Sequence, residues 1–209
     1  MIRNLIWDFD GSLFDTYRAQ AELLSKILRD YHGVEIEPKS IRKLTSVNLG
    51  YALDELAKLA GTDAITLRSL LVDLSIRIPL KEEPPFPFAK EICLKVRESG
   101  GQNFINTHKD RKRLTELLKY HGMDHFFSHM ITVEDSFPRK PDPASFIALV
   151  DRHHLNPGET MVIGDRDLDI TGGRNAGLKT YFFDSNGIGS RGILSDYREE
   201  SLEPLLKLI

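Results

Sequence analysis

The N-terminal stretch IRNLIWDFDGSLFDT places two carboxylates directly after a short apolar run. The apolar run, residues 2–7, has the length and composition of a buried strand in a mostly parallel sheet. Ligands of such sheets bind just outside the carboxyl ends of the strands, so we expect Asp8 and Asp10 to face a crevice. Residues two positions apart in an extended chain point the same way, and both carboxylates can therefore address one bound group.

Two carboxylates in a crevice are costly unless they bind a cation or transfer protons, because desolvation and mutual repulsion both oppose their ionisation. Gly11 lets the backbone turn away without a side chain in its path. An Asp-rich turn that only caps the end of a strand fits residues 8–11, DFDG, equally well. The motif by itself leaves both alternatives open.

Chain length and charge limit the classes of protein to be considered. The 209 residues suffice for one substantial core and a small second domain. The formal net charge of −3, without any block of Lys and Arg, predicts neither a nucleic-acid partner nor a membrane surface. No obligate protein partner is inferred, and a small molecule remains the expected ligand.

The features that report on cellular compartment favour the cytoplasm. Cys93 is the single cysteine, so no disulfide can form within the chain and a reducing compartment fits. The N-terminus reaches Asp8 too soon for the apolar region of a signal peptide, and no apolar run approaches membrane-spanning length.

Helical periodicity dominates residues 17 to about 80, with no convincing strand. The stretch EEPPFPF, residues 82–88, cannot be regular helix or central strand because its prolines lack the N–H donor and fix φ. It is predicted to be a linker that returns the chain to a sheet domain.

From Ala89 onward, helix and strand patterns alternate. Strands are expected at 103–107, 130–133, 160–163 and 180–183, and Asp142 with Pro143 is expected to begin a helix. The fold class predicted is α/β, a doubly wound Rossmann-like parallel sheet with a small all-helical cap domain inserted after the first strand. The expected boundaries are 1–15 and 87–209 for the catalytic core and 16–86 for the cap.

Further polar residues follow the other predicted strands. Thr107 closes the second strand, Lys140 lies in RKPDP, and Asp165 begins an acidic triplet in IGDRDLD. Each is ambiguous alone: the threonine could be an ordinary cap, the lysine a solvated loop residue, and the triplet a helix start that gathers acids.

Together these residues supply what phosphoryl transfer requires. Carboxylates from Asp8 and Asp165 with a backbone carbonyl, expected to be that of Asp10, suit Mg²⁺. The absence of a cysteine–histidine cluster from the sequence argues against zinc. A cation and Lys140 would cancel the repulsion between a phosphate and an aspartate. One carboxylate could then attack phosphorus while the other transfers protons.

In order along the chain, DFDGSLFDT, the threonine of NTHKD, the lysine of RKPDP and GDRDLD resemble the four motifs of the haloacid dehalogenase superfamily. The resemblance implies that Asp8 is the nucleophile and Asp10 the general acid/base. It further implies that Thr107 and Lys140 hold the transferring phosphoryl group.

The same resemblance implies a Mg²⁺ site formed by Asp8, Asp165 and the carbonyl of Asp10. Asp169 would support the metal or orient the lysine, whereas Asp167 matches no family ligand and is interpreted as structural.

An Asp two residues after the nucleophile is typical of the phosphatases and phosphomutases of this superfamily, and not of its dehalogenases. The helical insertion resembles the small cap of the phosphoglycolate phosphatase and β-phosphoglucomutase group.

Three positions depart from the usual pattern: Ser12 stands where Thr is usual, His108 where Asn is common, and Arg166 where a small hydroxyl residue is common. His108 and Arg166 could alter which leaving group fits, although Arg166 could instead pair only with Asp167.

The cap offers polar and aromatic residues that could select the substrate, namely Tyr17, Arg18, Asn48 and Tyr51, each of which could instead be plain surface. The expected function is a Mg²⁺-dependent phosphatase that hydrolyses a small phosphorylated metabolite through an aspartyl phosphate. A phosphomutase shares the same motifs and is the nearest alternative. A non-catalytic phospho-acceptor protein and a scaffold with a decayed site are more distant ones.

Overall fold

The structure, a computed structural model, describes residues 1–47, 49–185, 187 and 192–209. These residues form two compact units, one of residues Met1–Phe14 and Pro85–Ile209 and the other of residues Asp15–Pro84. The first unit contains the sheet, and the second contains only helices in its described part. No helix in the described ranges is long and apolar enough to cross a membrane.

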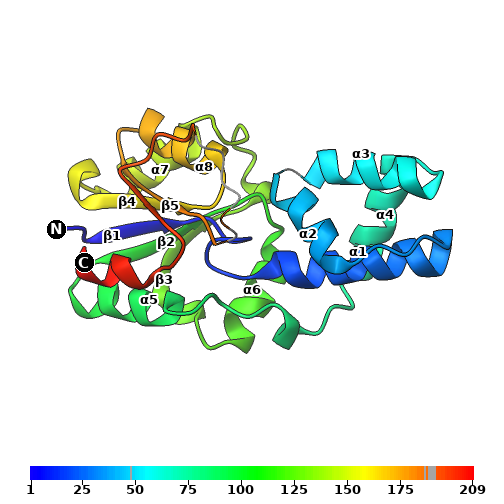
Figure 1. The fold of residues 1–209 in the computed structure, drawn as a ribbon. Coiled ribbons are helices and arrows are strands. Elements are labelled where there is room, and N and C mark those ends of the chain that lie inside the picture. The colour runs from blue at the N-terminus through cyan, green and yellow to red at the C-terminus, as the bar shows by residue number, and fades with distance from the viewer. Residues whose placement is uncertain (48, 186, 188–191) are drawn as a thin grey trace. The chain divides into compact units, whose positions relative to one another are not determined.

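The sheet unit is built on six strands, all parallel, in the order β3-β2-β1-β4-β5-β6. The expectation of an α/β, Rossmann-like parallel sheet is confirmed. Figure 1 shows β1 in the middle of this sheet, between β2 and β4. The strand bounds are β1 Asn4–Trp7, β2 Gln102–Asn106, β3 Phe127–Ile131, β4 Thr160–Gly164, β5 Lys179–Phe183 and β6 Tyr197–Glu199.

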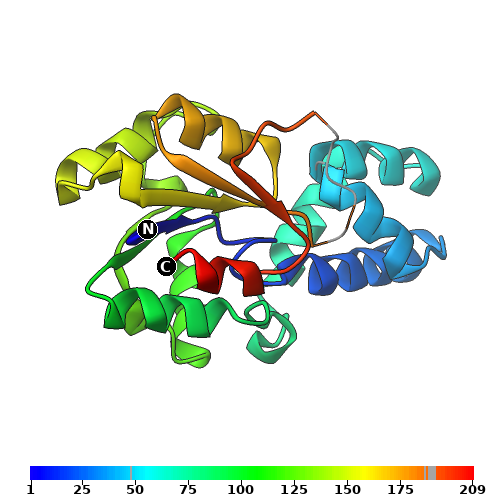
Figure 2. The same cartoon turned by 60° about the vertical axis from the view of Figure 1, so that its left-hand side comes forward.

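Helices cover both faces of the sheet. Figures 1 and 2 show α7 and α8 over one face and α5 and α6 over the other. The bounds are α5 Ala89–Glu98, α6 Arg111–Tyr120, α7 Ala144–His153 and α8 Asp167–Asn175, with short 3-10 turns η2 Asp124–Phe126, η3 Val133–Asp135, η4 Pro157–Glu159 and η5 Glu203–Lys207. The two chain ends meet beside α5, where the N–H of Ile2 donates to the carbonyl of Leu208 at 2.9 Å.

Strand β1 and its neighbours are apolar because both faces of the sheet are covered. Ile6, Phe104 and Val162, from three adjacent strands, pack with α7 residues such as Phe146 in one buried cluster. The short strands therefore have little freedom to shift in register, and the positions where they end are fixed relative to one another.

Capping explains where several helices begin. The side chains of Asp63 and Asp110 accept the N–H groups of Thr66 and Arg113, at 2.9 and 2.8 Å, as expected for N-caps. Helix α7 begins one residue later than predicted, at Ala144, because Asp142 accepts the N–H of Ala144 across Pro143.

The helical unit consists of α1 Thr16–His32, α2 Pro38–Val47, α3 Leu49–Ala60, α4 Ala64–Ser75 and the turn η1 Leu80–Glu82. Leu24, Ile27, Leu53 and Leu67, which come from three of these helices, have no exposed surface and form its core. Burial of such side chains supplies about 1.5–3 kcal/mol each, which accounts for a separate core in so short a segment.

Helix α8 lies close to the sheet because it carries two consecutive glycines. A Cβ placed on Gly172 would lie 2.7 Å from the ring of Phe146, and one on Gly173 would lie 2.8 Å from Cγ2 of Val162. Both neighbours are buried, so neither can move aside easily.

We predict that Gly173→Ala destabilises the protein even though alanine is the better helix former. The gain of about 1 kcal/mol in helix propensity is smaller than the cost of crowding a packed core, about 1–3 kcal/mol. Urea denaturation should show a lower free energy of unfolding, by up to about 2 kcal/mol. Gly192→Ala is the control, because no atom of another described residue lies within 4 Å of its added Cβ. A Gly173→Ala variant as stable as the control would contradict this account of α8.

Candidate functional site

The predicted site residues follow the carboxyl ends of three adjacent strands. Asp8 follows β1, Thr107 follows β2 and Asp165 follows β4, and Trp7 pairs in register with Ile105 and Ile163. Asp8 donates its N–H to the carbonyl of Ile163 at 2.9 Å, so the hydrogen-bonded ladder continues to the first motif itself. Strands whose register is fixed thus bring these residues to one edge of the sheet.

The centre of the site is the side chain of Lys140. Its ammonium donates to Oδ1 of Asp8 at 2.7 Å, to the backbone carbonyl of Asn106 at 2.9 Å, and to Oδ1 of Asp169. The side chains of Lys140, Asp8 and Asp169 are exposed by 2% or less. The three residues come from distant parts of the chain and form one buried ionic cluster. The peptide bond between Lys140 and Pro141 is cis.

Burial sets the ionisation of this cluster. Desolvation, with the charge of Asp169 adding to it, raises the pKa of Asp8 to about 6, although Lys140 and Arg166 act in the opposite direction. Desolvation alone would lower the pKa of Lys140, but the carboxylates of Asp169 and Asp8 outweigh it and raise that pKa. Lys140 is therefore a cation at neutral pH.

Two carboxylate oxygens in the cluster have no hydrogen-bond partner among the residues that the structure describes. They are Oδ2 of Asp8 and Oδ2 of Asp169, both fully buried. Three carboxylate oxygens lie within 4.8 Å of one another, one each from Asp8, Asp165 and Asp169. Because an unpartnered buried carboxylate oxygen is costly, this arrangement fits a bound cation, and the all-oxygen donor set suits Mg²⁺.

Asp165 is held in this group by a residue of the first motif. Ser12 Oγ donates to Oδ1 of Asp165 at 3.2 Å. Ser12 has no exposed surface and lies in the turn after β1, where Gly11 adopts a positive φ of 87°. The hydroxyl at this position therefore links the first motif to the fourth.

A glycine lets Asp169 reach the lysine. A Cβ on Gly164, the last residue of β4, would lie 2.2 Å from Cβ of Asp169. No side chain can therefore replace the glycine unless Asp169 moves, and Asp169 lies in the first turn of α8.

The second carboxylate, Asp10, forms an ion pair of its own. Lys109 Nζ lies 2.8 Å from Oδ1 of Asp10. Sequence reasoning did not single out this lysine, which is the fourth residue of NTHKD. Its position two residues after Thr107 was the only signal. Thr107 itself is buried, and its Oγ1 accepts the N–H of Lys109 at 3.2 Å.

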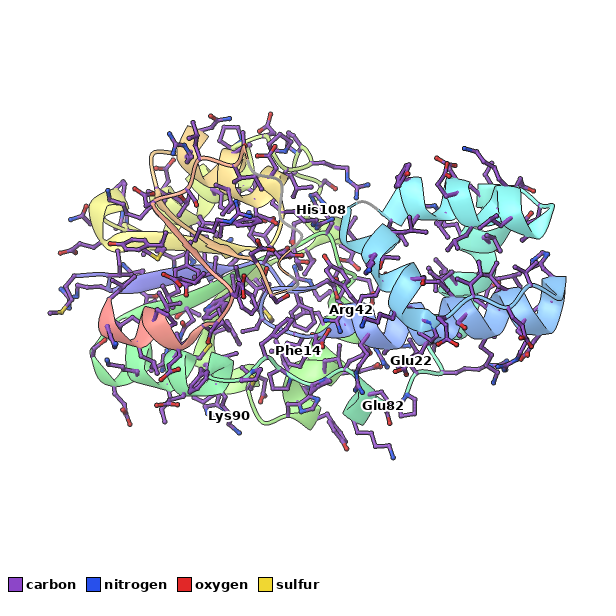
Figure 3. The ribbon with its side chains drawn as sticks, in the orientation of Figure 1. Phe14, Glu22, Arg42, Glu82, Lys90 and His108 are labelled. Carbon is purple, nitrogen blue, oxygen red and sulfur yellow. The ribbon has the colours of Figure 1, made fainter. Side chains whose placement is uncertain are left out.

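His108 and Arg166 both lie near the ionic cluster. The backbone N–H of Lys140 donates to Nε2 of His108 at 3.2 Å, so His108 is a neutral acceptor in this arrangement. Desolvation, followed by the charges of Lys140, Arg139 and Arg166, lowers the pKa of His108 to about 4. In Figure 3 His108 is labelled on the segment after β2.

The remaining predicted residues are Asp167 in the sheet unit and residues of the helical unit. Asp167 accepts a bond from the Thr171 hydroxyl at 3.2 Å within α8. Tyr17 is buried in α1, and Tyr51 is 49% exposed on α3. Asn48 lies outside the described residues. The role of these cap residues in substrate selection remains a prediction.

Comparisons with known proteins agree with this geometry. The sequence model of the haloacid dehalogenase-like hydrolase family matches residues 5–183. The chain is 25% identical to the phosphoglycolate phosphatase of Vibrio cholerae, over 86% of this chain and 83% of the relative. It is also 25% identical to the pyrophosphatase PpaX of Bacillus mycoides, over 86% of this chain and 82% of the relative.

A solved structure shows the same fold. YfnB of Bacillus subtilis, described as a HAD-hydrolase and solved bound to magnesium, superposes with a TM-score of 0.76 at 19% identity, over 99% of this chain and 98% of that one.

We predict that the stability of the protein depends on pH through His108. Its pKa is about 4 when folded, against an ordinary value of 6.5, so between these values the unfolded chain binds a proton that the folded chain does not. This contribution to the free energy of unfolding is complete above pH 6.5 and is lost as the pH falls towards 4. His108→Asn should therefore lose less stability than the wild type over this range, as measured by urea denaturation at a series of pH values.

His125→Asn, which alters an exposed ring, is the control and should follow the wild-type curve. Parallel curves for wild type and His108→Asn would contradict the prediction.

The match of the family model over most of the chain, together with the acidic residues, the buried lysine and the sheet that positions them, shows that this chain belongs to the haloacid dehalogenase-like hydrolases.

Proposed function

We propose that the protein is a Mg²⁺-dependent phosphatase that hydrolyses a small phosphorylated metabolite through an aspartyl phosphate on Asp8. The observation that supports this most is the buried cluster of Lys140, Asp8 and Asp169, in which two carboxylate oxygens lack a hydrogen-bond partner from residues 1–47, 49–185, 187 and 192–209. A cluster that only stabilised the fold would be expected to pair those oxygens.

Asp8 is proposed to act as the nucleophile. Its carboxylate attacks phosphorus, the bond between phosphorus and the leaving oxygen breaks, and an aspartyl phosphate forms. Lys140 fixes the orientation of the attacking carboxylate through Oδ1 and contributes a positive charge next to the incoming phosphate. A bound Mg²⁺ would neutralise charge on the phosphoryl oxygens, held by Asp8, Asp165 and, as the family resemblance implies, the carbonyl of Asp10.

Asp10 is proposed to handle the protons. It gives a proton to the leaving oxygen in the first step, and takes one from the water that attacks the aspartyl phosphate in the second. The second step releases inorganic phosphate and restores the Asp8 carboxylate. Thr107 is proposed to donate its hydroxyl hydrogen to a phosphoryl oxygen, which is compatible with its oxygen accepting the N–H of Lys109.

The curated relatives suggest the first substrates to test. They are named for phosphoglycolate and for pyrophosphate, both of which are small and phosphorylated. The magnesium bound in YfnB supports the same metal here.

We predict that Asp8→Asn lowers turnover by about 10³-fold or more, because the amide is a poor nucleophile for phosphorus. The assay is release of inorganic phosphate from p-nitrophenyl phosphate, phosphoglycolate and pyrophosphate, with and without Mg²⁺. Asp167→Asn is the matched control, since that carboxylate bonds within α8, and it should keep most of the activity. Full turnover by Asp8→Asn would contradict the proposal, and so would a long-lived phosphorylated form without phosphate release. Transfer of the phosphoryl group to a second hydroxyl of a sugar phosphate would instead show a phosphomutase.

We also predict that Ser12→Ala weakens the response to Mg²⁺. Without the hydroxyl, Asp165 loses one donor to its carboxylate, and loss of such a partner typically costs about 10–100-fold in metal affinity. The measurement is the Mg²⁺ concentration that gives half-maximal phosphatase activity. Ser12→Thr keeps the hydroxyl and is the control. An unchanged Mg²⁺ requirement in Ser12→Ala would show that the contact to Asp165 does not support a metal.

A further inference from the structure

The geometry points to Lys109 as the residue that positions Asp10 for proton transfer to the leaving group. This inference rests on the proposed function, in which Asp10 is the general acid/base. It is carried by the ion pair between Lys109 Nζ and Asp10 Oδ1 at 2.8 Å, which joins the turn after β1 to the segment after β2.

The lysine side chain is itself held in place. It is only 14% exposed, and its ammonium lies 5.6 Å from the centre of the Phe9 ring. Phe9 has no exposed surface and stacks on Phe14 with ring centres 4.5 Å apart. A cation over a fixed aromatic face has fewer positions available than one on an open surface.

The backbone of Lys109 is fixed as well. Its N–H donates to Thr107 Oγ1 at 3.2 Å, and its carbonyl accepts the N–H of Val133 at 3.4 Å. Asp110, the next residue, is the N-cap of α6. The base of the lysine is thereby tied to a strand end, a neighbouring turn and a helix, which suits a group that has to hold another side chain in one orientation.

The contact is compatible with both forms of Asp10 that the reaction needs. A protonated carboxyl group carries its hydrogen on one oxygen, and the other oxygen still accepts a hydrogen bond. Lys109 can therefore donate to Oδ1 whether or not Oδ2 carries the proton. During the first step the proton passes from Oδ2 to the leaving oxygen while the ammonium keeps its place, and no proton is exchanged with Lys109.

Lys109 could also act on the substrate directly, and the experiment below distinguishes this role from the positioning of Asp10. An ammonium near the leaving group could bind a negative charge on the substrate directly. That role would matter only for substrates whose leaving group carries a further negative charge, such as a carboxylate, whereas positioning of Asp10 matters for every leaving group that requires a proton.

The test is the change in kcat/KM caused by Lys109→Met with three substrates. In p-nitrophenyl phosphate the leaving group departs without needing a proton. In β-glycerol phosphate and phosphoglycolate the leaving oxygen belongs to an alcohol and must be protonated as it departs, and of these leaving groups only glycolate also carries a carboxylate. We expect a loss of about 10²-fold for both alkyl phosphates, the range attributed to a positioned acid, and only a small loss for p-nitrophenyl phosphate. The KM for p-nitrophenyl phosphate should stay close to that of the wild type.

Two further variants complete the design. Lys109→Arg keeps a cation within reach of Asp10 and should restore part of the activity on the alkyl phosphates. Lys112→Met removes an exposed lysine from α6 and should leave all three values unchanged.

The possible results separate the hypotheses. Equal losses on all three substrates would overturn the positioning role and indicate a structural one. A loss confined to phosphoglycolate would overturn it in favour of direct substrate binding. If Lys109→Met behaves like the wild type, the ion pair has no part in catalysis. A wild type that hydrolyses none of the substrates would overturn the proposed phosphatase function, and the positioning role with it.

Discussion

The structure of the site depends on one buried ammonium shared by two buried carboxylates. Lys140 contacts Asp8 and Asp169, and both acids remain almost fully enclosed. One positive charge cannot neutralise two negative charges, so Lys140 by itself leaves a deficit of positive charge, and two oxygens have no hydrogen-bond partner within the described part of the chain. In a medium of low polarity such a deficit is unfavourable, and a divalent cation placed among these oxygens would remove it. The arrangement is therefore understandable as a site completed by a ligand.

The backbone explains why such an unfavourable cluster can exist. Parallel strands of fixed register end together, so Asp8 and the Asn106 carbonyl reach Lys140 from adjacent strands. Gly164 removes the side chain that would otherwise displace Asp169. The apolar packing beneath the strands buries Ile6, Phe104 and Val162. The free energy gained from this packing offsets the cost of burying the charged groups at the strand ends.

Local patterns were enough to predict the parallel sheet and the residues that follow its strands, because apolar runs ending in Asp8 or Asp165 are visible within a few positions. Strand β6 was not predicted, since its three residues are all exposed and show no alternation. The contacts of Lys109 with Asp10 and of Ser12 with Asp165 were missed for a different reason. They span 99 and 153 positions, and no periodicity in the sequence records which loops the sheet brings together.

The two motif carboxylates differ in their surroundings in a way that suits the different roles proposed for them. Each is paired with a lysine, but the side chains of Asp8 and Lys140 are 2% and 1% exposed, whereas those of Asp10 and Lys109 are 26% and 14% exposed. A nucleophile that must react with phosphorus and avoid water is better placed in the enclosed pair. A group that passes protons to a leaving oxygen and receives them from water needs access to both, and the more open pair provides it. Two aspartate–lysine ion pairs, buried to different depths at the ends of the strands, can thus give two chemically identical carboxyl groups different roles in the reaction.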